Sequence, residues 1–152
     1  MKLVALAAVV LMGFVLVGSA AADGPAPLAL SNKAVGGGRL NDYTPGVEGG
    51  TGLNNIGLLI RTWGKVTFVD TTNKFFYIND GAGREDGSGK VGLRVSYDNL
   101  APGNTITLPP DFLNSYVAVT CISSTWLNGS AQIQPNLRPR RQADITLIAP
   151  PP

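Results

Sequence analysis

The sequence contains no histidine and only one cysteine. Without histidine, the chain lacks the side chain that most often acts as a general base near neutral pH, and it lacks the commonest zinc ligand. Cys121 has no partner for an internal disulfide or a thiolate metal site, so we interpret it as a small buried hydrophobic residue rather than a reactive thiol. We therefore expect a non-catalytic protein with no cofactor and no metal.

Charged residues of either sign are also scarce. Twelve basic residues stand against 10 acidic ones, for a formal net charge of +2. This balance creates no overall field that would attract nucleic acid or an anionic membrane, so electrostatic binding would have to come from a local patch.

The first 22 residues have the pattern of a signal peptide. Lys2 precedes an apolar run from Leu3 to Val17, and small residues follow up to Ala22, the expected cleavage site. The alternative, a membrane anchor, is disfavoured because the run is shorter than the roughly 20 residues of a spanning helix. We expect export to the cell envelope or the medium, with no membrane span after cleavage and a single domain remaining.

Residues 23–56 are rich in glycine and proline, which disfavours helices and long strands. One interpretation is a flexible linker. The other is an N-terminal arm that lies along the domain or a neighbouring subunit, because the segment carries several large apolar residues. These are Leu28, Leu30, Val35, Leu40, Tyr43, Val47 and Leu53.

The stretch 57–81 predicts two β-strands joined by a turn at residues 70–73. Apolar and polar residues alternate along its first half, which is typical of a half-buried strand. The alternation places Ile60, Val66 and Phe68 toward the core. Gly64 interrupts the strand and indicates a sharp bend, which would allow one strand to serve two sides of a barrel.

Three more strands are predicted at residues 91–97, at 116–124, and after a turn at Asn128-Gly129. We expect Pro135 and Pro139 to break this fifth strand or confine it to an edge, and at most a short helix at residues 110–114. The loop 81–90 fits no phosphate-binding, dinucleotide or EF-hand pattern and is interpreted as a mobile β-turn loop. Residues 149–152 form a proline-rich tail.

The order of these elements resembles an OB-fold, the five-stranded Greek-key barrel. The resemblance is carried by IRTWGKVTFVD, FFYINDGAG, VGLRVS and YVAVTCIS, and it is closest to OB modules of exported bacterial proteins. It implies an all-β, small antiparallel barrel over residues 57–148. Two features depart from that pattern: prolines cut down the helix between strands three and four, and Cys121 stands where related domains usually have glycine.

The outward face of the first three strands is predicted to be basic and aromatic. OB-folds bind single strands with such a face, because rings stack on bases while cations follow the phosphates. Three arginines near the fifth strand would extend it. The candidate ligand-binding residues are Arg61, Trp63, Lys65, Phe75, Tyr77, Arg94, Arg138, Arg140 and Arg141.

Three functions fit this face. The first is a binding module for single-stranded nucleic acid or another polyanion. The second is a structural subunit of an extracellular or cell-surface assembly that contacts itself or another surface protein through the arm and the barrel face. The third is a glycan-binding module.

Overall fold

The computed structural model describes residues 24–151, and the signal peptide predicted at residues 1–22 lies outside them. These residues form an all-β structure, as predicted, with two short 3-10 turns, η1 (Asn32–Ala34) and η2 (Gln142–Asp144). Among the described residues, no helix has the length and apolar character needed to cross a membrane. The strands are β1 (Leu28–Ala29), β2 (Leu59–Asp70), β3 (Phe75–Asn79), β4 (Leu93–Ser96), β5 (Tyr116–Leu127), β6 (Ile133–Arg138) and β7 (Ile145–Ala149).

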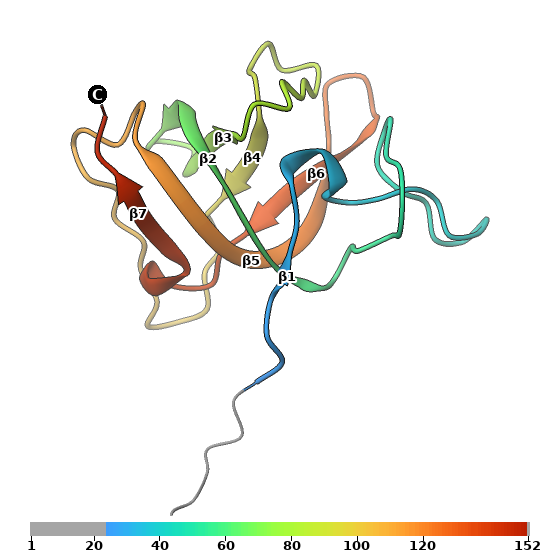
Figure 1. Cartoon of the computed structure of the whole chain (residues 1–152), viewed down its shortest axis with the longest axis horizontal. Helices are drawn as coiled ribbons and strands as arrows, with labels where there is room; N and C mark the ends of the chain where they lie inside the picture. The colour runs from blue at the N-terminus through green and yellow to red at the C-terminus, as the bar shows by residue number, and fades with distance from the viewer. Residues whose placement is uncertain (1–23, 152) are drawn as a thin grey trace, which may run out of the picture.

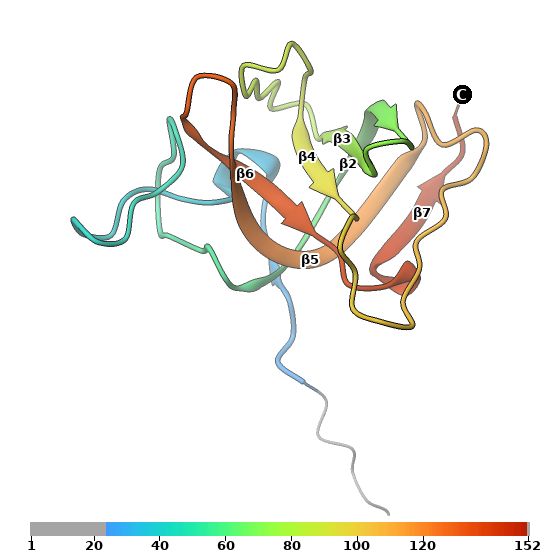
Figure 2. The same cartoon turned by 180° about the vertical axis from the view of Figure 1, so that it is seen from behind.

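Five of the strands close into a barrel in the order β2-β3-β4-β6-β5, with β5 returning to pair with β2 (Figures 1 and 2). The barrel is mixed rather than wholly antiparallel, because β4 and β6 run parallel while its other pairs are antiparallel. The architecture is compatible with an OB-like fold. Strands β1 and β7 add to it as the outermost members of the sheet.

Strand β2 closes the barrel by changing neighbours along its length. Its residues 59–65 pair with β5, and its residues 65–70 pair with β3. Gly64 stands at the change, where a Cβ atom would lie 2.7 Å from the backbone carbonyl carbon of Asn79. Only glycine allows the two strands to approach this closely, which gives a steric reason for glycine at position 64.

A one-residue bulge reverses the predicted direction of Phe68. Val66 pairs with Ile78 and Phe68 pairs with Tyr77, so Thr67 is the extra residue on β2. Beyond the bulge, the side chain of Val69 packs against the core, and Phe68 packs on the outer surface against Phe75 and Tyr77. The prediction that Phe68 faces the core is therefore wrong, because a one-residue shift moves a side chain to the other face.

The core is a single apolar cluster, which Phe112 extends at one end of the barrel. The Phe112 ring meets the Phe76 ring edge to face, with 5.0 Å between their centroids. The short helix predicted at residues 110–114 is wrong, since these residues form turns. The buried cluster comprises Val35, Ile60, Val66, Phe76, Ile78, Leu93, Val95, Tyr97, Phe112, Val117, Val119, Cys121 and Leu137.

The N-terminal arm completes the barrel near the start of β2. Val35 is fully buried in the core, and β1 pairs in parallel with β2. The Asn55 side chain accepts hydrogen bonds from the Gly36 N–H at 2.8 Å and from the Ser123 hydroxyl at 3.0 Å. Of the two interpretations of the arm, the structure therefore supports packing along the domain.

Pro135 does not confine the fifth strand to an edge. Strand β6 lies between β4 and β5, with Pro135 opposite Thr125 and with Asn136 and Leu137 paired to β4. The strand tolerates the proline because its pairing to β4 begins one residue later, where amide groups are again present. Strand β6 ends at Arg138, immediately before Pro139, and β7 is a separate strand paired to β5.

Candidate functional site

Three aromatic rings pack together on the outer surface of β2 and β3. Phe68 stacks on Phe75 with 5.9 Å between centroids, and Tyr77 meets both rings edge to face, at 6.2 and 6.0 Å. The cluster exists because the bulge at Thr67 turns Phe68 outward and the register places it opposite Tyr77. Such offset and edge-on pairs are the stable arrangements of neighbouring rings.

Arg94 on β4 lies between two of the molecule's aromatic rings. Its guanidinium carbon is 3.6 Å from the Phe75 centroid and 4.6 Å from the Trp126 ring. The Arg94 Nε donates to the Ser96 hydroxyl at 3.2 Å, and that hydroxyl donates to Asn136 Oδ1 at 2.9 Å. The rings and the hydroxyl together orient the plane of the guanidinium.

Lys90 adds a second cation to this surface. Its ammonium nitrogen lies 4.4 Å from the centre of the Phe68 ring. Among the described residues, neither Lys90 nor Arg94 forms a salt bridge. We refer to Phe68, Phe75, Lys90, Arg94 and Trp126 as the Arg94 cluster; all five are partly exposed.

Tyr77, a predicted ligand-binding residue, lies on the outer face of the sheet but has no exposed surface. Its hydroxyl donates to Asp86 Oδ2 at 2.7 Å and lies 3.1 Å from the Ser88 hydroxyl. Burial raises the pKa of Tyr77. The loop 81–90 is thus packed over the sheet through Asp86, which is 2% exposed, instead of lying free as a turn. Tyr77 supports the rings and does not reach solvent here.

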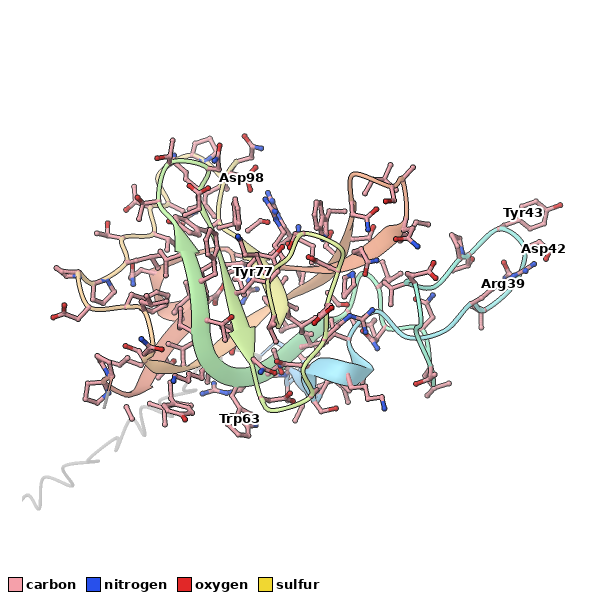
Figure 3. All side chains as sticks on the ribbon, turned by 90° about the horizontal axis from the view of Figure 1, so that it is seen from above. Arg39, Asp42, Tyr43, Trp63, Tyr77 and Asp98 are labelled. Atoms are coloured by element: carbon pink, nitrogen blue, oxygen red, sulfur yellow. The ribbon has the colours of Figure 1, made fainter. Side chains whose placement is uncertain are left out.

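Three other predicted site residues occupy a different part of the surface. Arg61 and Trp63 line a groove on β2 and β5 together with residues of β1 and β7. Lys65 follows on the same strand, opposite Tyr116. Figure 3 shows Trp63 at the edge of the molecule, apart from Tyr77. The sequence-predicted face therefore divides into the Arg94 cluster and this groove.

The three arginines expected to extend the basic face are held by carboxylates. Arg138 donates to Asp98 Oδ1 at 2.6 Å, and Arg140 donates to both carboxylate oxygens of Asp144. Arg141 lies 3.6 Å from the same carboxylate. Burial acts to raise the pKa of Asp144, but hydrogen bonds from Arg140 and the two nearby arginine charges outweigh it and lower that pKa. Two carboxylates thus offset two of these three cations where they stand.

The single thiol and the carboxylates are the other groups that could react or bind a metal. Burial, with a smaller contribution from Asp144, raises the pKa of Cys121 to about 12, so the thiol stays protonated at neutral pH. Within residues 24–151, no three Cys, Asp or Glu side chains gather in a way that could hold a metal ion. The Arg94 cluster itself consists of two cations and three aromatic rings.

Three members of the Arg94 cluster escape prediction from sequence. The sequence pattern places Phe68 in the core because it does not reveal the bulge at Thr67, and Lys90 lies in a loop that the sequence predicts to be mobile. Trp126 lies beyond the predicted end of its strand, at residue 124, because β5 continues to Leu127. Continuing the alternation of Ile122 and Ser124 past that end would have placed Trp126 on the outer face, so one signal was available.

Comparisons with known proteins yield no match: no family model, curated protein or solved structure matches the chain. The Arg94 cluster is therefore judged by its own geometry.

Proposed function

We propose that this chain is a non-catalytic, exported binding module of OB type, which binds a polyanion, single-stranded nucleic acid first among them, through the Arg94 cluster. The observation that carries the proposal is the guanidinium of Arg94 held between Phe75 and Trp126 without a carboxylate partner among the described residues. The resemblance to OB-folds adds support, because these barrels commonly bind oligonucleotides on strands two and three. Those strands correspond here to β3 and β4.

An oriented guanidinium suits phosphate recognition. Its Nε donates to the Ser96 hydroxyl, and no salt bridge among the described residues engages its terminal nitrogens, which we expect to donate toward a ligand. Arginine binds phosphate oxygens with paired N–H groups, and stacking between rings keeps those groups in one plane. Lys90, which sits over Phe68, supplies a point charge for a second phosphate.

Two of the aromatic rings in the Arg94 cluster are not free to stack on nucleic-acid bases. Arg94 covers one face of Phe75, and Lys90 lies over Phe68, so the cations occupy ring faces that would otherwise stack on bases. We therefore expect binding to follow the phosphate backbone, without sequence preference, and to be weak. With two phosphates neutralised and a slope of about −0.7 for each, the slope of log affinity against log salt concentration should be about −1.4.

The test is fluorescence anisotropy of a labelled oligothymidylate titrated with the mature protein across a salt series. The Arg94→Gln variant should lose most of the binding and flatten the salt slope by about 0.7. Arg39→Gln is the matched control, because it removes the same charge from an exposed residue that lies away from the cluster. Heparin and polyphosphate as competitors identify which polyanion binds best.

Two results would contradict the proposal. One is the absence of binding to all three polyanions at low salt. The other is equal binding by the Arg94 and Arg39 variants, because the attraction would then depend on total charge and not on the oriented guanidinium.

A further inference from the structure

An open apolar groove of about 570 Å³ runs along the outer surface of β2 and β5. It is bounded by β1 and β7, the two outermost strands of the sheet. Trp63 is 50% exposed and Ile148 is 57% exposed, so two large apolar side chains face solvent in one place. The lining includes Ala29, Leu30, Arg61, Trp63, Ala118 and Ile148. A surface of this kind favours contact with another apolar side chain.

A hairpin-like part of the arm, residues 38–52, projects away from the barrel (Figures 1 and 3). Its backbone is held by hydrogen bonds from the Gly38 N–H to the Gly52 carbonyl at 3.1 Å and from the Leu40 N–H to the Thr44 carbonyl at 3.0 Å. At its base, a Cβ atom on Gly50 would lie 2.1 Å from the carbonyl oxygen of Gly37. This close glycine packing fixes the base of the hairpin and thereby the direction in which its tip points.

The tip of this hairpin presents apolar side chains that nothing in the described chain covers. Tyr43 is 96% exposed and Leu40 is 69% exposed. The tip has a defined turn conformation, in which Asn41 Oδ1 accepts the Tyr43 N–H at 2.9 Å and Arg39 pairs with Asp42. Tyrosine is enriched among residues that dominate binding energy, and a pre-ordered loop loses little entropy when it binds.

We propose that the hairpin tip of one molecule docks into the groove of a second copy of this chain, with Tyr43 and Leu40 against Trp63 and Ile148. The molecule cannot fill its own groove, because Tyr43 points away from the barrel and Trp63 lies on a different side of it (Figure 3). Asp42 at the tip is 79% exposed, and its pair with Arg39 is a surface ion pair of small net worth, so on docking it can exchange Arg39 for Arg61 in the groove. This contact is separate from the Arg94 cluster, so either proposal stands without the other.

The contact joins two different surfaces, so each molecule keeps a free tip or a free groove after pairing. Such head-to-tail contacts propagate into open chains or close into rings. We therefore expect assembly to grow with protein concentration and not to saturate at a dimer.

Sedimentation velocity of the mature protein over a wide concentration series provides the test. The wild type should shift progressively to larger species, whereas Tyr43→Ser and Trp63→Ser should each stay monomeric. Mixing the two variants should form a dimer that grows no further, because one intact tip and one intact groove remain. Leu127→Ser is the matched control, since it removes an exposed apolar side chain elsewhere and should assemble like the wild type.

Circular dichroism establishes that each variant is folded, which is expected because all the altered side chains are exposed. A wild type that stays monomeric at every concentration overturns the proposal. So does a mixture of the two variants that remains monomeric, or assembly that survives in both variants.

Discussion

Asn32 and Asp80, 48 positions apart in the sequence, hold each other through two reciprocal hydrogen bonds. The backbone N–H of Asn32 donates to Asp80 Oδ2 at 2.8 Å, and the backbone N–H of Asp80 donates to Asn32 Oδ1 at 3.0 Å. The Asn32 amide also donates to the Thr62 hydroxyl at 2.9 Å and to the Trp63 carbonyl at 3.1 Å. One fully buried side chain thus joins the arm to β2 and to the end of β3.

Replacing Asn32 with alanine should therefore destabilise the fold. The change leaves the Asp80 N–H and the buried Thr62 hydroxyl without their partner, and an unsatisfied buried polar group costs about 1–3 kcal/mol. We expect the free energy of unfolding to fall by about 2 kcal/mol, measured by urea denaturation. Asn104→Ala is the control, because the Asn104 side chain is exposed and bonds only its own turn. Equal stabilities of the two variants would mean that the hydrogen bonds of the Asn32 side chain do not contribute to the stability of the fold.

Gly64 should tolerate no side chain. A Cβ atom there would lie 2.7 to 2.9 Å from three backbone atoms of Asn79, and backbone yields less readily than a flexible side chain. Gly64→Ala should lower the free energy of unfolding by about 1–3 kcal/mol, the usual cost of overpacking. The same measurement on Gly129→Ala should show little change, because nothing lies within 4 Å of a Cβ atom at Gly129. Comparable losses in both would refute the steric explanation.

The sequence predicts the barrel well wherever alternation is regular. Ile60 and Val66 are buried and Arg61 and Trp63 are exposed, as the period-two pattern requires. The pattern does not reveal a bulge, since inserting Thr67 as an unpaired residue leaves the composition of the strand unchanged. Every prediction beyond that point on β2 is therefore inverted, and this inversion is what brings Phe68 into the candidate site.

Contacts between distant loops were equally invisible to pattern analysis. Nothing in the local sequence indicates that Asp86 accepts a hydrogen bond from the Tyr77 hydroxyl. Nor does it indicate that Phe112, in the segment where the sequence predicts a short helix, packs against Phe76. The charge of the surface near β6 could not be predicted from the sequence for the same reason. A run of cations predicts a basic surface, but whether it stays basic depends on carboxylates such as Asp98 and Asp144 that only the fold brings near.

Cys121 should be unreactive until the protein unfolds. Its side chain is fully buried, and burial raises its pKa to about 12, so the thiolate that attacks thiol reagents is scarce at pH 8. Ellman's reagent should label the native protein only at the rate of unfolding and should label it promptly in concentrated urea. Rapid labelling without denaturant would show that the core around Cys121 opens locally.

Asp144 should make the fold lose stability in acid. Its carboxylate is 4% exposed and receives the Arg140 backbone N–H at 2.7 Å, the Arg140 Nε at 3.1 Å and the Arg140 Nη2 at 3.2 Å. Burial disfavours the charged form, but the hydrogen bonds from Arg140 and the nearby charges of Arg140 and Arg141 outweigh it, and the folded pKa lies below its ordinary value of 3.8. The charged Asp144 therefore makes its full contribution to the free energy of unfolding at pH values above the pKa of Asp144 in the unfolded chain. This contribution declines as the pH falls toward the lower pKa of Asp144 in the folded protein, because the unfolded chain takes up the proton first.

Urea denaturation from neutral pH down to about pH 3 measures this loss. Asp144→Asn should be less stable than the wild type at neutral pH. The difference between their free energies of unfolding should narrow as the solution is acidified, because protonation removes the stabilising charge of the wild-type carboxylate and the asparagine amide carries no charge at any pH. Asp111→Asn, a change at an exposed carboxylate, is the control and should follow the wild-type curve. If the difference in the free energy of unfolding between the wild type and Asp144→Asn were the same at all pH values, the carboxylate would act only through its shape and its hydrogen-bond acceptors. Its negative charge would then contribute nothing to the contact between Arg140 and the start of β7.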